Sequence, residues 1–290
     1  MRLALMIEGQ EGVSWEDWLA LARACEEHGV EALVRSDHYL SQTGAEQPAL
    51  DAWAVIAALA AQTTRLELGT LVSPVTFRAA AVLANVSATA NEIAAGRVAL
   101  GMGTGWMEAE HEAFGFPFPE MKTRLQWLEE QIQAVRRFWG DRPHPHLIVG
   151  GSGLSGTVGP AANWADEYKT VFATPEECAE RREKLVRACV RAGRAPIPLS
   201  LMTACAIGRT PEEARERIRR RLERSGQTVD PDEYKAARGS AAVLGTLEEA
   251  AEQLRGYERA GVERVMLQHL DHRDLEMVAL IGRELAPRVT

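Results

Sequence analysis

The feature that most constrains the fold is a strand-then-helix alternation that repeats eight times along 290 residues. Short apolar runs suit buried strands, and each is followed by a segment with helical spacing. The expected strands are residues 3–7, 32–34, 66–72, 98–101, 146–149, 168–172, 199–207 and 262–267. The expected helices are residues 15–28, 51–62, 78–95, 122–139, 155–163, 175–193, a segment opening at 211, 246–260 and 273–285.

This alternation is typical of an α/β protein. We expect a single (β/α)8 TIM barrel with inserted loops, forming one domain over residues 1–290. A doubly wound open sheet is the alternative, although it usually needs fewer strands at this length. Ser14 with Asp17 predicts the start of the first helix, and Gly29 predicts its end. Residues 226–244 show no clear pattern and are interpreted as an inserted loop or short helix before the last unit.

The composition of the chain indicates which classes of molecule it binds. The chain has 33 basic and 41 acidic residues, a net charge of -8, which argues against non-specific nucleic-acid binding. No apolar run approaches the roughly 20 residues that cross a bilayer, and the N-terminus lacks signal-peptide features. Four scattered cysteines favour neither disulfides nor a cysteine zinc site. We therefore expect a cytoplasmic protein with a small-molecule partner, no nucleic acid and no membrane.

In a barrel of this kind, chemistry belongs at the carboxyl ends of the strands. Ser36-Asp37-His38 follows the second expected strand. Neighbouring side chains point in different directions, so these three cannot form a catalytic triad among themselves. His38 could donate or accept a proton near neutral pH, and Asp37 could hold a turn or orient a ligand. A turn with a solvent-facing histidine is the alternative interpretation.

Two glycine-rich segments follow the fourth and fifth expected strands. The alternate glycines of residues 101–105 permit close approach of a flat or phosphorylated ligand. They do not match the dinucleotide pattern G-x-G-x-x-G. Residues 150–153 precede an expected helix, where free backbone N–H groups bind phosphate, and a flexible loop is the alternative. Because residues 143–168 contain no Lys or Arg, any phosphate there would depend on backbone N–H groups, Ser152, Thr157 or a cation from another loop.

Other polar clusters suggest ordinary structural roles. His144 and His146 flank a proline where a strand begins, so no metal site is expected. The basic stretch 215–224 has acidic partners at i,i+4 spacing and is interpreted as a solvated helix face. Trp106 and the phenylalanines that follow it would wall an apolar pocket or pack a loop.

Taken together, several segments resemble the luciferase-like monooxygenase superfamily, and within it the oxidoreductases that depend on the deazaflavin coenzyme F420. The segments that carry the resemblance are residues 6–10, 35–38, 68–78, 96–106, 113–119 and 149–153. Each is modest, but their order and spacing are specific, and they extend over nearly the whole chain. The family fold is a TIM barrel, and homodimers are usual in the family.

The resemblance implies F420 as the cofactor and His38 as the catalytic residue, which would stabilise charge or move a proton during hydride transfer. Asp37 would hydrogen-bond the ring edge. The Thr70–Leu71 peptide corresponds to a family bulge, often a cis peptide, that backs the ring, and Ser73 would contact the ring. The other implied cofactor contacts are Gly103, Thr104 and Gly105 at the ring or ribityl chain, and Gly150, Gly151, Ser152 and Gly153 at the phosphate.

The sequence also departs from its relatives. The sugar-phosphate dehydrogenases of this family carry a catalytic Glu where this chain has Trp106, and Glu108 and Glu110 lie two and four residues away. A sugar phosphate is thus disfavoured, and we expect a small, mostly apolar organic substrate, with Glu8 and Trp106 in its pocket. Three alternatives stay open: a monooxygenase that uses reduced FMN and O₂, a flavin-binding barrel without catalysis, and, more distantly, a metal-dependent hydrolase using His38 and His269.

Overall fold

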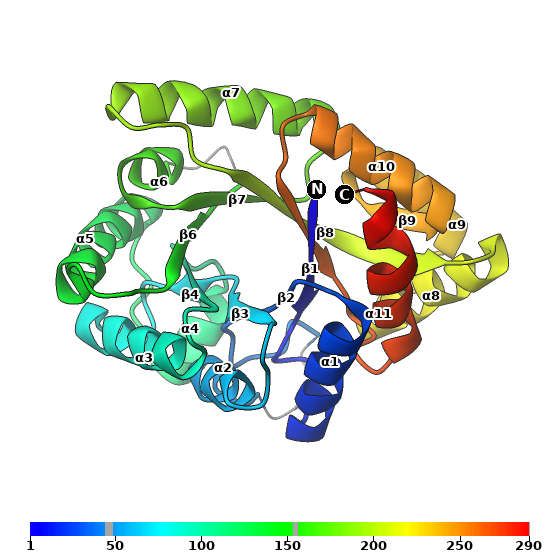
Figure 1. The fold of residues 1–290 in the computed structure, drawn as a ribbon, viewed down its shortest axis with the longest axis horizontal. Helices are drawn as coiled ribbons and strands as arrows, with labels where there is room; N and C mark the ends of the chain where they lie inside the picture. The colour runs from blue at the N-terminus through cyan, green and yellow to red at the C-terminus, as the bar shows by residue number, and fades with distance from the viewer. Residues whose placement is uncertain (44–48, 153–155, 290) are drawn as a thin grey trace.

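The computed structural model describes residues 1–43, 49–152 and 156–289. Parallel strands form a closed barrel, because β10 pairs with both β1 and β8 (Figure 1). In barrel order the strands are β1 (Arg2–Ile7), β2 (Ala32–Arg35), β3 (Glu67–Thr70), β5 (Val98–Gly103), β6 (His146–Gly150), β7 (Glu167–Val171), β8 (Leu199–Gly208) and β10 (Arg264–Gln268). The predicted (β/α)8 barrel is confirmed.

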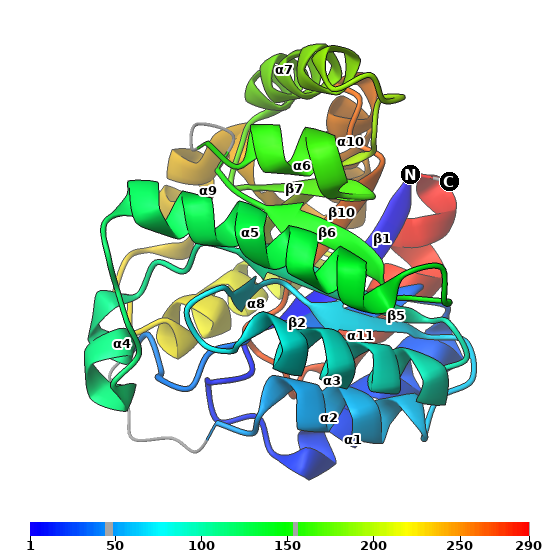
Figure 2. The same ribbon diagram turned by 90° about the vertical axis from the view of Figure 1, so that its left-hand side faces the viewer.

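The described residues also form helices that pack around the barrel, and most of these helices cover the outer faces of the strands (Figure 1). They are α1 (Trp15–His28), α2 (Ala52–Ala60), α3 (Ala80–Ile93), α4 (Glu108–Phe114), α5 (Met121–Trp139), α6 (Val158–Trp164), α7 (Pro175–Arg191), α8 (Pro211–Arg224), α9 (Pro231–Arg238), α10 (Leu247–Arg259) and α11 (Leu275–Leu280). Figure 2 shows α2, α3 and α5 side by side along one flank. None of the described helices is long and apolar enough to cross a membrane.

Local signals set several helix boundaries. At α1 the Ser14 side chain accepts from the Asp17 backbone N–H, and the Asp17 carboxylate accepts from the Ser14 backbone N–H. Gly29 ends the helix at a φ of 83°, a left-handed conformation that glycine adopts without steric cost. The helices that begin after Thr174 and Thr246 carry the same capping box. These boundaries follow from contacts between residues a few positions apart, so the sequence predicts them well.

Two helices, α4 and α6, differ from expectation, and the structure also defines the segment that shows no clear pattern in the sequence. Helix α4 lies in a stretch interpreted as a loop, and no side chain caps its start at Met107. The segment expected to be an inserted loop or short helix contains the short helix α9, capped by Asp230, and also the short strand β9 (Val243–Thr246), which was not expected. Strand β9 pairs with the second half of β8, outside the closed barrel. Helix α6 begins at Val158, three residues later than expected.

The middle of the barrel interior is apolar, and both of its ends carry polar side chains. A layer of mostly small or flexible apolar side chains fills its middle: Ala4, Met6, Ala32, Val34, Ala99, Ile148, Met202 and Met266. At the amino ends of the strands, Arg264 forms ion pairs with Glu67 at 2.5 Å and Glu167 at 3.4 Å. Toward the other end, β1 is followed by Glu8, and β7 and β10 contribute Lys169 and Gln268. These polar side chains therefore lie at the end of the barrel where proteins of this fold bind their ligands.

Candidate active site

A cavity of about 460 Å³ opens at the carboxyl ends of the strands. That volume lies within the range of small-molecule sites. The residues expected at the site that line it are Glu8, His38, Leu71, Gly103, Thr104, Gly105, Trp106, Gly150, Gly151 and Ser152. Gly153 lies outside the described residues. The barrel therefore brings together side chains from segments that are far apart in the sequence.

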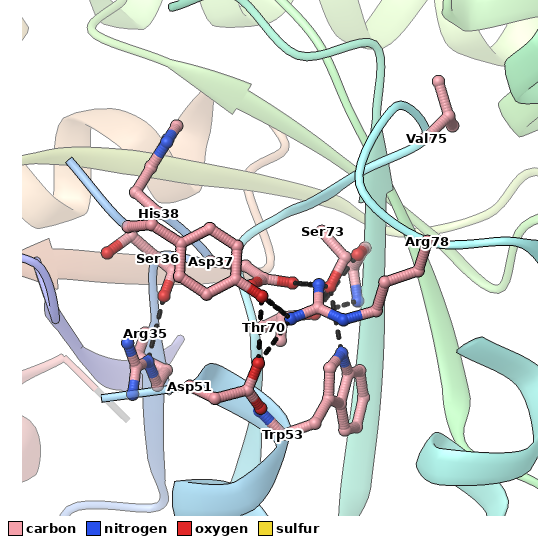
Figure 3. Close-up of polar contacts among 12 residues, drawn as sticks. Arg35, Ser36, Asp37, His38, Asp51, Trp53, Thr70, Ser73, Val75 and Arg78 are labelled. Atoms are coloured by element: carbon pink, nitrogen blue, oxygen red, sulfur yellow. Dashed lines mark hydrogen bonds and ion pairs between the residues drawn. The ribbon is translucent and has the colours of Figure 1, made fainter. Parts of the chain in front are cut away.

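Three other expected contacts, Asp37, Thr70 and Ser73, do not line this cavity. Asp37 is only 1% exposed, and both of its carboxylate oxygens are already engaged (Figure 3). Arg78 donates to them at 2.6 and 3.1 Å, and the Ser73 hydroxyl donates at 2.5 Å. Thr70 Oγ1 lies 3.2 Å from Ser73 Oγ. These three residues support the cavity wall from behind.

Arg78 is the centre of this supporting network. Besides Asp37, its guanidinium donates to the Tyr39 hydroxyl at 2.6 Å and to Asp51 at 2.8 Å (Figure 3). Although burial opposes its charge, the Asp37 carboxylate raises the pKa of Arg78. The network ties the loop after β2 to the starts of α2 and α3, which fixes the loop that carries His38. Arg78 ends one of the family-like segments, but sequence reasoning assigned it no role.

His38 is held by a residue that sequence reasoning left without a function. Its Nδ1 lies 2.7 Å from Oε2 of Glu110, whose side chain is fully buried on α4. The other Glu110 oxygen accepts from the backbone N–H groups of Tyr39 at 2.5 Å and Leu40 at 3.1 Å. An ionised carboxylate only accepts hydrogen bonds, so Nδ1 carries the proton. The pairing leaves Nε2 of His38 as the ring nitrogen available to a bound molecule.

The two partners shift each other's pKa. Burial disfavours the imidazolium, but the hydrogen bond and charge of Glu110 outweigh it and raise the pKa of His38. Burial likewise disfavours the carboxylate, yet His38 and the two backbone donors lower the pKa of Glu110. The active-site cavity thus contains a histidine that stays protonated to a higher pH than usual.

This pair should make stability depend on pH. Because folding raises the pKa of His38, its contribution to the free energy of unfolding is fully present below pH 6.5, the ordinary pKa of histidine. Because folding lowers the pKa of Glu110, its contribution is fully present above pH 4.5, the ordinary pKa of glutamate. We therefore expect the free energy of unfolding of wild type relative to His38→Gln to be greatest between those values. It should decline as pH rises through the raised His38 pKa, and as pH falls through the lowered Glu110 pKa. Denaturant titrations across pH would check this, and a pH-independent difference would contradict it.

The bulge after β3 forms one wall of the cavity. Its cis peptide joins Leu71 and Val72, so the expected position, Thr70–Leu71, is wrong by one residue. Both Leu71 and Val72 line the cavity. A Cβ on Gly103 would lie 2.5 Å from Val72 Cγ2, and one on Gly150 would lie 2.8 Å from Val72 Cγ1. Both glycines are thus needed to admit Val72, and they leave that wall without projecting side chains.

Gly103→Ala should therefore lower the free energy of unfolding by about 1–3 kcal/mol, the usual cost of overpacking. Combining it with Val72→Ala removes the clashing methyl groups, so the double variant should lose less than the sum of the two single losses. Gly159→Ala is the control, because nothing lies within 4 Å of a Cβ added there. If a denaturant titration showed that the losses in free energy of unfolding of the two single variants simply add in the double variant, the proposed clash between Val72 and a side chain at position 103 would be contradicted.

The segment expected to bind phosphate is only partly as predicted. Gly150, Gly151 and Ser152 line the cavity, but α6 begins six residues after Ser152, at Val158. A cation that lines the same cavity comes from the next strand, because Lys169 on β7 lies in register with Gly150. Lys169 directly follows the stretch 143–168 that contains no Lys or Arg, and it was not among the residues expected at the site. The alternation of Glu167, Lys169 and Val171 along one strand face could have revealed it.

The two residues expected in the substrate pocket take different positions. Trp106 is 59% exposed at the rim, with its ring centroid 5.7 Å from that of His38. Glu8 is buried deeper, where its two oxygens accept from the side-chain amides of Gln268 at 2.6 Å and Gln10 at 3.1 Å. The cavity therefore has an aromatic rim and a polar floor.

Two remaining interpretations can be compared with the structure. The predicted solvated face of α8 is wrong for Arg217 and Arg221, which are 4% and 6% exposed. Arg221 donates to the Gln268 backbone oxygen at 2.7 Å, behind the polar floor. Within residues 1–43, 49–152 and 156–289, no cluster of three His, Cys, Asp or Glu could hold a metal ion.

Comparison with known proteins identifies relatives of this chain. The F420-dependent glucose-6-phosphate dehydrogenase of Rhodococcus hoagii (strain 103S) is 41% identical over 133 residues. That match spans 43% of this chain and only 38% of the relative. The enzyme of the same name from Nocardia farcinica (strain IFM 10152) is 29% identical over 93% of this chain and 92% of its own.

Among solved structures, monooxygenase RslO1 from Streptomyces bottropensis superposes with a TM-score of 0.84 at 21% identity, over 100% of both chains. At that identity the likeness concerns the fold alone. The family model of the luciferase-like monooxygenases matches residues 2–282. Since that match includes every barrel strand, this chain belongs to the luciferase-like monooxygenase family.

Proposed function

We propose that this protein is an F420-dependent oxidoreductase that transfers a hydride between the deazaflavin and a small, mostly apolar organic molecule. The observation that carries the proposal is the buried His38–Glu110 pair in a cavity that is also lined by the bulge at Val72 and by Gly103 and Gly150. The names of the sequence relatives support F420 as the cofactor. We also propose, from the sequence alone, that the chain forms one domain, assembles as a homodimer and is located in the cytoplasm.

We expect the cavity to accept a flat ring system. The bulge at Leu71–Val72, together with Gly103 and Gly150, offers a surface on which such a ring could stack. The deazaflavin would supply the hydride chemistry, and the protein would supply orientation and electrostatics.

Each lining group has a proposed task. Gly150, Gly151 and Ser152 would face the cofactor's phosphate. His38 would hold or release a proton at Nε2 while Glu110 fixes its ring. Trp106, at the rim, would limit the access of water to the reacting atoms.

The test is a fluorescence-quenching titration of the purified protein with F420, run in parallel with FMN. Saturable binding of F420 with little binding of FMN is the expected result. Preference for FMN would transfer the assignment to a monooxygenase that uses reduced FMN and O₂, to be checked by oxygen consumption. Absence of binding to either, in well-folded protein, would overturn the proposed function.

A further inference from the structure

The cavity holds a second pair of charged side chains, Lys169 and Glu8, that the His38–Glu110 pair does not involve. They are 6% and 7% exposed, and both line the cavity. Glu8 is anchored by two side-chain amides. The Lys169 ammonium, by contrast, has neither a hydrogen-bond partner nor an ion-pair partner among the residues that the structure describes. A free buried donor therefore points toward the space that a ligand would occupy.

A buried ammonium without a partner is costly, because it has lost water and gained nothing in return. Burial accordingly lowers the pKa of Lys169 to about 8, although the Glu8 charge opposes the shift. Gly150, its register partner on β6, has no side chain, and Ser200, its register partner on β8, donates its hydroxyl to the Tyr168 backbone oxygen at 3.5 Å. The charged or titratable side chains of the same cavity are Glu8 and His38. Among the described residues, the ammonium therefore has no compensating contact with an oxygen atom within hydrogen-bond distance, and a ligand oxygen would supply it.

The charges of this part of the cavity decide which oxygen would suit it. Lys169 and Glu8 together carry no net charge, so a full anion placed between them would be repelled by Glu8 about as strongly as it is attracted by Lys169. A neutral carbonyl or hydroxyl oxygen avoids that repulsion and still accepts the hydrogen bond. A donor on a carbonyl oxygen also draws electron density from the carbon that receives a hydride.

We propose that Lys169 Nζ binds the reacting oxygen of the substrate, which is a ketone or aldehyde in one direction and the matching alcohol in the other. In the reducing direction the carbonyl carbon would receive the hydride of reduced F420 and the oxygen would receive a proton from His38 Nε2, and oxidation of the alcohol would return both. This deepens the proposed function and rests on it. Lys169 is then a substrate-binding residue, distinct from the groups proposed to hold the cofactor.

The test uses 4-(dimethylamino)acetophenone, a ketone whose absorption band moves to longer wavelength when its oxygen accepts a strong hydrogen bond. Wild-type protein without cofactor should bind it with a red shift. The shift should be lost in Lys169→Met and kept in Lys169→Arg. Lys184→Met, which changes an exposed lysine on α7, is the matched control and should behave as wild type. The wild-type shift should fade as pH rises above about 8, while that of Lys169→Arg should persist.

A second measurement uses the F420 titration and turnover of cyclohexanone with reduced F420. Lys169→Met should lower kcat/KM about 10²–10³-fold, as loss of one oxyanion donor does, with F420 affinity unchanged within twofold. Absence of a ketone shift in wild type, or an undiminished shift in Lys169→Met, would overturn the proposal. So would loss of F420 binding in Lys169→Met, which would make Lys169 a cofactor ligand. Wild-type protein could also show a ketone shift that depends on Lys169 and yet fail to bind F420. That result would support the oxygen-binding site and overturn the proposed cofactor.

Discussion

His38→Ala is expected to lower turnover about 10²–10⁴-fold, the usual contribution of a positioned acid or base, with little change in F420 affinity. The reason is geometric. His38 is buried at the cavity, and Glu110 occupies its Nδ1, so Nε2 is the atom that can exchange a proton with a bound molecule. The alanine variant removes that group and leaves the bulge, Gly103 and Gly150 unchanged.

Steady-state kinetics and the F420 titration, performed on the same protein preparations, would measure both quantities. His144→Ala is a suitable control, because His144 stacks on Trp139 and does not line the cavity. Equal turnover in wild type and His38→Ala would remove the catalytic role of His38. A parallel loss of turnover and F420 affinity would instead show that the histidine mainly holds the cofactor.

Glu110→Ala is expected to lower the free energy of unfolding by about 3–5 kcal/mol, the cost of removing one partner of a buried ion pair. The carboxylate has no exposed surface, and its removal strands three donors: His38 Nδ1 and the backbone N–H groups of Tyr39 and Leu40. Turnover should also fall, because the His38 ring loses the contact that orients it and raises its pKa.

Two variants make this result interpretable. Glu112→Ala changes an exposed glutamate on the same helix and should cost under about 0.5 kcal/mol. Glu110→Gln keeps an oxygen for the two backbone donors, so it should be less destabilising than Glu110→Ala while still shifting the pH dependence of turnover. A denaturant titration in which Glu110→Ala and Glu112→Ala behave alike would contradict the account.

Several parts of the site were visible in the sequence because short segments carry them. The strand ends, the two glycine-rich segments and His38 each sit where the alternation of strands and helices predicts. The family resemblance added the bulge, although it placed the cis peptide one residue too early. Contacts with a cofactor at Asp37, Ser73 and the other expected residues stay predictions, and the placement of these two behind the wall favours a supporting role.

The decisive contacts of the site were not visible in the sequence. Glu110 reaches His38 across 72 positions, and Lys169 meets the cavity because β7 pairs with β6 in one register. Arg221 belongs to a stretch that looks solvated, yet it is buried against Gln268, 47 positions away.

What the sequence by itself determined is therefore the order of strands and helices, the helix caps and the end of the barrel where chemistry belongs. These features depend on hydrophobic periodicity and on hydrogen bonds between residues a few positions apart. Only the tertiary structure decided which acid holds His38, which side chains reach the cavity and which lie behind its wall. Those outcomes depend on barrel closure and strand register, which bring together side chains whose separation along the chain carries no local signal.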